Sequence, residues 1–556
     1  MKKLRAIVGV VGIGFLGISP CQLAGATPEG RVALSSDSLR TIRPIAIQHS
    51  GRHKPFDSFA WETLKFIAGS PRRGSEDPVE TILSIIAFPE DWIDEKLISV
   101  PFVPLREVLG LERKTSHVSF NDLIATRKLM RLLPPIVAKQ QRDEKLTMLE
   151  QETMDVYERF ATLNTLFEHQ LYLVPPPSGT NASWLPILVA TDYPPEKEAE
   201  FQSGWMELIA DLREGESEAI DASARRLVEA LQNANPSAYP ARWRLILEVC
   251  YNKLGPFRIA RLFYMIAFLG FAISLSGSRR LAGAVGISGL WAAFLLHGSG
   301  IIMRVILGGR PPVSNFYETM LWLPFVAAVL ALIFEGIYHA RYFGLSAAGL
   351  AAVTLLLADY VPLDSSIAPV VAVLRSTLWL TVHVLIIVAS YGALALATVL
   401  AHVYGWLYLV RRSDRAALEK LGLFLYRAIQ VGVVLLAGGV MLGAVWANAS
   451  WGRYWGWDPK ETWALITLLW FLAILHGRFA GWIKGVGVAL LTISGFFLLL
   501  MTYYGVSFYL VGLHSYAGGH AKPLPPLLIA YLLAELLFIA AVGVPAFSRR
   551  RLLPPV

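Results

Sequence analysis

Cysteine is almost absent from this chain: Cys21 and Cys250 are the only two, and no C-x-x-C pair occurs. The lack of such a pair argues against a thiol-redox enzyme. The sequence also contains no P-loop and no Rossmann glycine pattern, so it gives no support to an ATP-driven pump. Charged residues make up only 17% of the chain, against 54% hydrophobic residues and a mean hydropathy of +0.49, which is too apolar for an ordinary soluble enzyme.

The first 26 residues are typical of a secretory signal peptide. Three basic residues in the first five positions precede the apolar run 6–18, and Ala24-Gly25-Ala26 matches a cleavage site. Cys21 would suit a lipoprotein signal, but Pro20 beside it suits one poorly. We therefore expect residues 27–250 to be exported. A domain with Cys250 as its one cysteine has no internal disulfide.

Residues 27–250 are predicted to form a mainly helical extracytoplasmic domain. Asn121–Tyr172 and Pro195–Asn233 are rich in helix-forming residues. His49 and His53 lie in a polar, turn-rich segment near the start of the domain and are possible ligands, although histidines in such segments are more often surface or core residues. The domain is expected to contact a partner rather than to perform chemistry.

Nine apolar segments after Pro256 are each long enough to cross a hydrocarbon core of about 30 Å. The predicted fold class is therefore an all-α polytopic membrane protein, with a membrane domain at 256–547 and a basic tail at 548–556. The nine segments are 257–276, 282–303, 318–337, 343–360, 378–410, 425–447, 461–476, 483–503 and 525–547.

Basic residues gather in alternate loops between these segments. If residues 27–250 lie outside, every inward loop carries arginine, at 279–280, 341, 411–415, 478 and 549–551. The positive-inside rule then predicts a cytoplasmic (inner) membrane protein, with residues 27–250 and the loop at 451–463 on the periplasmic side. Most of the net charge of +8 can be traced to these loops, so no nucleic-acid partner is expected.

The loop at 451–463 contains Trp451, Trp455, Trp457 and Trp463 within 13 residues, between two apolar segments. Four indoles at a membrane surface can form a flat aromatic shelf for a large planar ligand. Tryptophans are also common membrane anchors, and the run Asp458-Pro-Lys-Glu461 is first of all a capping box for the following helix.

Two histidines from distant parts of the chain are predicted to reach the same membrane face as the tryptophan loop. His383 lies near the outer end of the fifth segment, and His514 follows the eighth. Imidazole binds iron at neutral pH, and one histidine on each side of a planar group is what six-coordinate haem requires. The sequence therefore predicts haem as the ligand.

The tryptophan loop resembles the "WWD" signature of the haem-handling proteins, which include CcsA (also called ResC), CcmF and CcmC. Three further strings are similar to the CcsA family: Gly309-Arg-Pro-Pro-Val-Ser-Asn-Phe-Tyr-Glu318, Ser376-Thr-Leu-Trp379 before His383, and Gly512-Leu-His-Ser-Tyr516. The resemblance covers roughly residues 256–547. Residues 48–59 look like a soluble part of fused CcsB–CcsA proteins.

The resemblance implies cytochrome c biogenesis by system II, in which haem b is both ligand and substrate. His383 and His514 would be the axial ligands of the haem iron, and Trp451 and Trp463 would contact the haem. Trp455, Trp457 and Asp458 would support catalysis, as a cytochrome c synthase (haem lyase) subunit joins haem to an apocytochrome C-x-x-C-H segment. Bis-histidine ligation would protect reduced haem until the two thiols add across its vinyl groups.

The resemblance also implies a haem route and partners. His476 would be a ligand for haem within the membrane, and His297 is a weaker candidate. The expected partners are a ResB/CcsB-like membrane subunit, apocytochrome c, haem and thiol-reducing proteins. Two alternatives stay open: a haem chaperone or transporter without ligase activity, and a non-haem transporter, which would show no Soret absorption.

Overall fold

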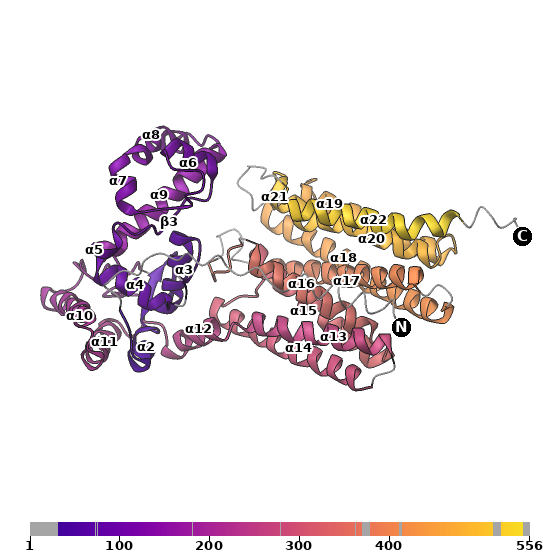
Figure 1. Cartoon of the computed structure of the whole chain (residues 1–556), viewed down its shortest axis with the longest axis horizontal. Helices are drawn as coiled ribbons and strands as arrows, with labels where there is room; N and C mark the ends of the chain where they lie inside the picture. The colour runs from indigo at the N-terminus through magenta and orange to yellow at the C-terminus, as the bar shows by residue number, and fades with distance from the viewer. Residues whose placement is uncertain are drawn as a thin grey trace, which may run out of the picture. The chain divides into compact units, whose positions relative to one another are not determined.

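The computed structural model describes residues 32–72, 74, 76–180, 182–277, 280–361, 363–369, 378–410, 414–514 and 524–548. The expected signal peptide, the basic tail beyond Ser548, and the segments at 370–377 and 515–523 lie outside these residues. The chain divides into two compact units, one ending at Lys253 and one beginning at Leu254. Figure 1 shows the elements of both units along the chain.

The first unit is mainly helical, with two small antiparallel sheets in the described residues. Its strands are β1 (Ala46–His49), paired with β2 (Arg52–Pro55), and β3 (Ile98–Ser99), paired with β4 (His117–Val118). Its helices are α2 (Ser36–Ile42), α3 (Phe56–Ala68), α4 (Pro78–Ala87), α5 (Pro89–Trp92), α6 (Val103–Leu109), α7 (Phe120–Thr126), α8 (Lys128–Gln141), α9 (Met148–Phe167), α10 (Pro195–Glu214), α11 (Ser217–Ala234) and α12 (Arg242–Leu254).

Both helical regions expected in this unit are helical, but each is interrupted. The first is divided at Arg127, which has a φ of 50°, and the second at Gly215, which has a φ of 80°. A left-handed residue ends a helix because its carbonyl no longer continues the hydrogen-bond ladder. Capping boxes at Ser119 and Thr147 then fix where α7 and α9 begin.

The second unit is a bundle of long apolar helices that run along a common direction (Figure 1). Among the described residues, nine helices are long and apolar enough to cross a membrane. The bundle contains α13 (Pro256–Ser276), α14 (Arg280–Gly308), α15 (Phe316–Tyr338), α16 (Tyr342–Tyr360), α17 (Leu378–Val410), α18 (Arg415–Trp451), α19 (Pro459–Phe479), α20 (Val486–Leu500), the π-helical turn η2 (Met501–Gly505), α21 (Val506–Tyr509) and α22 (Pro526–Ser548).

The predicted fold class is confirmed, and eight of the nine predicted segments start within three residues of an observed helix. The sixth is the exception, because α18 begins at Arg415, ten residues before the predicted start. Its first turns carry Arg415, Glu419 and Lys420 on the exposed side while Leu418 and Leu421 are buried. Hydropathy alone misses such an amphipathic extension.

Burial separates the central helices of the bundle from the peripheral ones. In α17, 72% of the apolar window is buried, against 17% in α22. The centre is therefore built on α17, whose Leu394 and Leu400 pack with Leu425 of α18. The peripheral α22 is tied to α17 by His402, whose Nε2 lies 2.7 Å from Oε2 of Glu535.

Candidate functional site

A cavity lies at the end of the bundle where α17 and α19 begin and α18 ends. It encloses about 890 Å³ of space between side chains, part of which is open to solvent. Aliphatic side chains from α17 and α18 form much of its wall. Its aromatic and polar lining residues are Phe316, Thr319, His383, Tyr391, Trp446, Trp451, Tyr454, Trp455, Lys460, Glu461, Tyr503, Ser507 and His514.

His383 lies in the first two turns of α17 and lines this cavity. Its Nδ1 is 2.8 Å from the carbonyl oxygen of Gly439 on α18. Because a carbonyl oxygen only accepts, Nδ1 carries the proton and Nε2 keeps its lone pair. Gly443, one turn further along α18, makes room for the ring, since a Cβ there would lie 2.6 Å from Cε1 of His383.

His514 lines the same cavity from the segment that follows α21. Its Nδ1 lies 2.8 Å from Oδ1 of Asp458. A carboxylate that accepts from one ring nitrogen fixes the tautomer and leaves the other nitrogen as a ligand, as in many metal-binding histidines. The ring also packs edge-on against Trp451, with centroids 5.6 Å apart, and lies 6.2 Å from Trp446.

Asp458 is the residue that connects the tryptophan loop to His514. Its side chain caps α19 by accepting from the amide of Lys460, and its Oδ2 accepts from the amide of Leu513 at 2.7 Å. Burial disfavours the charged carboxylate, but the hydrogen bonds from His514, Lys460 and Leu513 outweigh burial and hold the pKa of Asp458 below its usual range. The carboxylate is therefore ionised at neutral pH, with His514 as its side-chain partner.

The tryptophan loop is held by its capping box, as the sequence predicts. Oε2 of Glu461 accepts from the amides of Gly456 and Asp458 at 2.8 and 3.2 Å. Trp457 between them has a φ of 57°, a conformation that bulky residues rarely adopt. Strain of this kind persists only where surrounding contacts fix the backbone, and it occurs often at functional sites.

The four tryptophans of the loop do not form one shelf. Trp451 and Trp455 line the cavity. Trp457 is 70% exposed and stands edge-on to Trp455, with ring centroids 5.8 Å apart. Trp463 lies inside α19 and does not line the cavity. Trp446, near the end of α18 and outside the loop, also lines the cavity.

A π-helical turn brings a third group of residues to the cavity. The segment Met501–Gly505 interrupts the helix that continues from α20 to α21; Tyr503 of this turn and Ser507 of α21 line the cavity. π-Helical turns are rare in proteins overall, and those that occur often lie at functional sites. The ammonium of Lys460 donates to Oγ of Ser507 at 2.8 Å and to the carbonyl of Tyr503 at 3.2 Å. This places a cation at the cavity wall.

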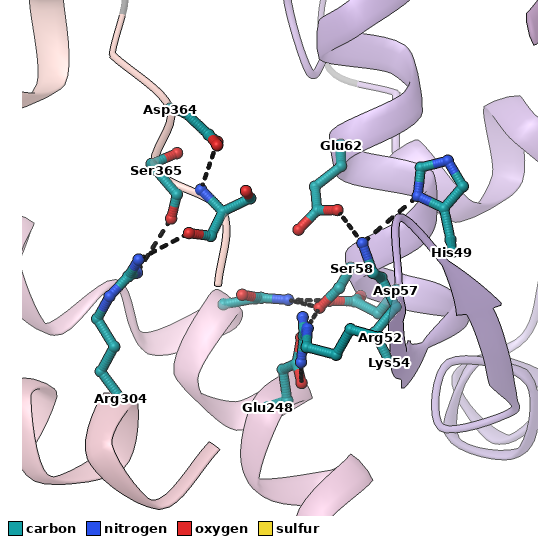
Figure 2. Close-up of polar contacts among 12 residues, drawn as sticks. His49, Arg52, Lys54, Asp57, Ser58, Glu62, Glu248, Arg304, Asp364 and Ser365 are labelled. Atoms are coloured by element: carbon teal, nitrogen blue, oxygen red, sulfur yellow. Dashed lines mark hydrogen bonds and ion pairs between the residues drawn. The ribbon is translucent and has the colours of Figure 1, made fainter. Parts of the chain in front are cut away.

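The family-like string at 309–318 forms a separate buried ion cluster at the same end of the bundle. Glu318 binds Arg304, with Nε and Oε1 3.0 Å apart, and Arg310, with Nη1 and Oε2 2.9 Å apart. Arg304 also donates to the carbonyls of Ser365 and Ser366, at 3.0 and 2.8 Å, in the loop that follows α16 (Figure 2). The cluster therefore fixes the loop that follows α16.

The remaining predicted histidines lie away from this cavity. His476 is exposed near the end of α19, and its Nδ1 lies 2.8 Å from the carbonyl oxygen of Leu472. His297 is fully buried among Phe257, Tyr264 and Phe325, whose ring centroids lie within 5.9 Å of its own. It does not line the cavity.

The polar segment near the start of the first unit forms a buried charge network. Arg52 pairs with both oxygens of Glu248, at 2.6 and 2.7 Å, and Ser58 donates to the same carboxylate at 2.6 Å (Figure 2). Lys54 pairs with Glu62 at 2.5 Å. These carboxylates are matched by cations, which is the arrangement of a structural network.

His49 and His53 lie on the hairpin that carries this network. Burial and the charge of Lys54 lower the pKa of His49 to about 4, so the ring is neutral at pH 7. His53 stacks near Trp184, with ring centroids 4.8 Å apart. Across the described residues, no group of three or more His, Cys, Asp and Glu side chains could hold a metal ion. The ligand interpretation of these two histidines gains no support.

Sequence reasoning identified four of the cavity residues, Trp451, Trp455, His383 and His514, and the carboxylate behind one of them, Asp458, while it gave Glu461 only a capping role. It missed Trp446, Lys460, Tyr503 and Gly443. Lys460 stands inside the tryptophan loop and could have been noted there. The others depend on how α18 and the π-helical turn pack, for which the sequence carries no local signal.

Comparisons with known proteins identify a family model and several relatives that match this chain. Residues 313–514 match the model of the cytochrome c assembly protein family. The chain is 31% identical over 501 residues to the protein NrfI of Wolinella succinogenes, which covers 85% of this chain and 54% of NrfI, so the chain spans about half the length of that relative.

Shorter relatives match the membrane unit. The chain is 35% identical over 246 residues to the cytochrome c biogenesis protein CcsA of Prochlorococcus marinus subsp. pastoris, which covers 39% of this chain and 78% of that protein. It is 34% identical over 254 residues to CcsA of Prochlorococcus marinus strain NATL2A, covering 80% of that protein. The chain is thus a multi-pass membrane protein that belongs to the CcsA family of cytochrome c biogenesis proteins.

Proposed function

We propose that this protein binds haem in the cavity between His383 and His514 and supports its covalent attachment to apocytochrome c. One observation carries the proposal: two histidines from distant segments line one cavity, and each has its Nδ1 engaged by an acceptor. Each ring therefore keeps its Nε2 lone pair available as a ligand. Two such nitrogens are the axial set of a six-coordinate haem.

The lining of the cavity supports haem rather than a polar substrate. Ile387, Val388 and Val440 offer an apolar wall, while Trp451 and Trp455 offer aromatic faces to a flat macrocycle. A haem also carries two carboxylates, which require compensation when they are partly removed from water.

Lys460 is the cation that we assign to a haem carboxylate. Its ammonium lines the cavity, and its two hydrogen-bond partners, Ser507 and the carbonyl of Tyr503, are both neutral. A carboxylate at this wall would therefore meet an ammonium whose charge is not already matched by an acid through a hydrogen bond. Salt-bridge formation there would fix which edge of the haem faces Lys460.

The attachment reaction joins each cysteine sulfur of a C-x-x-C-H segment to a vinyl carbon, and the thiol hydrogen passes to the other vinyl carbon. No net oxidant is needed, but the haem must stay reduced and its vinyl edge accessible. We assign Trp455 and Trp457 to the substrate side of the loop, because Trp457 is 70% exposed and lies against Trp455. The protein would position the haem and the apocytochrome segment and would exclude water from the site.

His476 is proposed to hold haem on its way to this cavity, with a second ligand from a ResB/CcsB-like membrane subunit. Its ring is exposed on α19, and its Nδ1 contact with the carbonyl of Leu472 leaves Nε2 available as a ligand. A histidine on the outside of a membrane helix is best explained by a neighbouring chain. We propose the cytoplasmic membrane as the location, with the cavity on the periplasmic side, from the distribution of basic loops.

Reconstitution separates attachment from simple haem delivery. The chain is co-expressed with a CcsB-like subunit and an apocytochrome that contains one C-x-x-C-H segment, and covalent haem is measured by haem stain after denaturing electrophoresis. Stained cytochrome that disappears for His383→Ala and His514→Ala supports the proposal. Haem bound to the chain with no covalent product would instead indicate a haem chaperone.

A further inference from the structure

A second cavity lies at the opposite end of the same helices. Its polar lining residues are Tyr404, Arg415, Glu419, Arg478 and Lys484. Tyr404 stands near the end of α17 and His383 near its start, so about 30 Å separates the two cavities along the helix at roughly 1.5 Å per residue. That length is about the thickness of the hydrocarbon core. The second cavity therefore lies at the headgroup level of the other membrane face.

The charge of this cavity is not balanced. Arg415, Arg478 and Lys484 bring three cations, and Glu419 is the one carboxylate in the lining. Within the described part of the chain, none of these cations makes a side-chain hydrogen bond or salt bridge. The guanidinium of Arg478 lies over the ring of Tyr426, 4.8 Å from its centroid, which holds it in place without neutralising it.

The surroundings of the cavity suit an amphiphilic ligand. Phe479 and Trp482, beside Arg478 at the turn between α19 and α20, are 88% and 82% exposed. Large aromatic residues at this level insert at the membrane interface. Gly485 keeps the base of the cavity open, because a Cβ there would lie 2.7 Å from the hydroxyl of Tyr404. Cations inside the cavity and apolar rings beside it match a charged head attached to acyl chains.

We propose that this cavity binds the phosphate headgroup of an anionic membrane lipid. Arg478 and Arg415 offer planar donors that match phosphate oxygens, Lys484 adds a mobile charge, and the Tyr404 hydroxyl can donate to the same group. Basic pockets between membrane helices are established headgroup sites in general. The proposal does not depend on haem, because its residues are about a membrane thickness from His383.

Native mass spectrometry of the full chain tests this assignment. The protein is placed in nanodiscs that contain equal phosphatidylglycerol and phosphatidylcholine, released into the gas phase, and its retained lipid is identified. We expect phosphatidylglycerol to be retained in preference. In the double variant Arg478→Gln/Lys484→Gln, the preference for phosphatidylglycerol over phosphatidylcholine should fall about 30-fold, because each basic side chain near the headgroup contributes roughly five-fold.

Lys420→Gln is the matched control, because Lys420 is exposed on α18 near Arg415 but does not line the cavity. It should keep the preference of the wild type, and Soret absorption should be the same in all three proteins. Equal retention of both lipids by the wild type would overturn the proposal, as would an equal loss in Lys420→Gln. Retention of inorganic phosphate with no lipid preference would assign the cavity to a soluble anion and would also overturn it.

Discussion

One carboxylate joins the start of α19 to a histidine 56 residues further along the chain: Oδ1 of Asp458 lies 2.8 Å from Nδ1 of His514 and also accepts from the amide of Lys460 at 2.9 Å. The position of His514 therefore depends on the position of the tryptophan loop. Any ligand held by His514 is therefore coupled through Asp458 to the tryptophan loop.

Asp458→Asn should weaken haem binding without unfolding the helix. Asparagine is as good an N-cap as aspartate, so α19 keeps its start, but a neutral amide no longer supports the imidazole as a charged acceptor does. We expect a loss of affinity of about 10- to 100-fold, the usual range when a residue that orients a metal-binding histidine is replaced, in a Soret titration with haem.

Asp414→Asn is the control for this effect, because Asp414 caps α18 through the amide of Ala417 and does not line the cavity. It should bind haem like the wild type. Equal affinities for Asp458→Asn and the wild type would show that the Asp458–His514 contact has no part in haem binding.

Gly443→Ala should displace His383. The added methyl would lie 2.6 Å from Cε1 of the ring, well inside contact distance, and the ring cannot move away without breaking its hydrogen bond to Gly439. Gly438→Ala is a close control on the same helix, since a Cβ there meets nothing within 4 Å. We expect the haem spectrum to change in the first variant and not in the second. Identical spectra would mean that His383 is not a ligand.

Glu318→Gln should destabilise the membrane unit strongly. Glutamine keeps the shape of the side chain, but it removes the carboxylate charge that pairs with Arg304, whose side chain is 1% exposed. Breaking one side of a buried ion pair costs about 3–5 kcal/mol. Asp359→Asn removes the charged partner of Arg261 in a more exposed ion pair, and it should lower the free energy of unfolding by about 1 kcal/mol or less. Thermal unfolding in one detergent compares the two, and equal midpoints would contradict the role of Glu318.

The stability of the first unit should fall on the acid side of neutrality because of His49. Its pKa in the folded protein is about 4, lowered by burial and by Lys54, against an ordinary value of 6.5. As the pH falls, His49 therefore gains a proton in the unfolded chain before it does so in the folded chain. The stabilisation is complete above pH 6.5 and is lost as pH falls toward 4, by about 3 kcal/mol at most and less after solvent screening.

Thermal unfolding of the full chain between pH 4 and 8 measures this loss. His49→Gln removes the titrating ring, so its unfolding midpoint should fall less steeply between pH 6.5 and 4 than that of the wild type. Parallel curves for the two proteins would show that His49 does not titrate in this range.

The membrane fold was largely predictable because hydropathy, helix length and loop charge all act locally. The segments around α15, α16 and α19 start and end within three residues of the observed helices. The start of α18 could not be predicted in this way, because Arg415 and Glu419 lie on the exposed side of an amphipathic turn whose apolar side is buried. Average hydropathy cannot distinguish such a turn from a loop.

The candidate site was only partly predictable. His383 and His514 could be identified because they follow from the topology together with the tryptophan loop. The tautomer of His383 depends on a carbonyl of α18, and the entry of Tyr503 into the cavity depends on a π-helical turn. Both are consequences of packing between distant helices. Trp463 shows the converse, since it belongs to the same loop sequence but lies inside α19 and does not line the cavity.

The visible spectrum of the purified protein, reduced and oxidised, is the most direct test of the proposed haem site. The full chain is prepared with a CcsB-like subunit as wild type, His383→Ala and His514→Ala, each with and without added imidazole. We expect a bis-histidine b-type spectrum in the wild type, weakened or lost in each variant and restored by imidazole. Spectra that are unchanged in both variants, or no Soret absorption in any preparation, would contradict the proposed haem site.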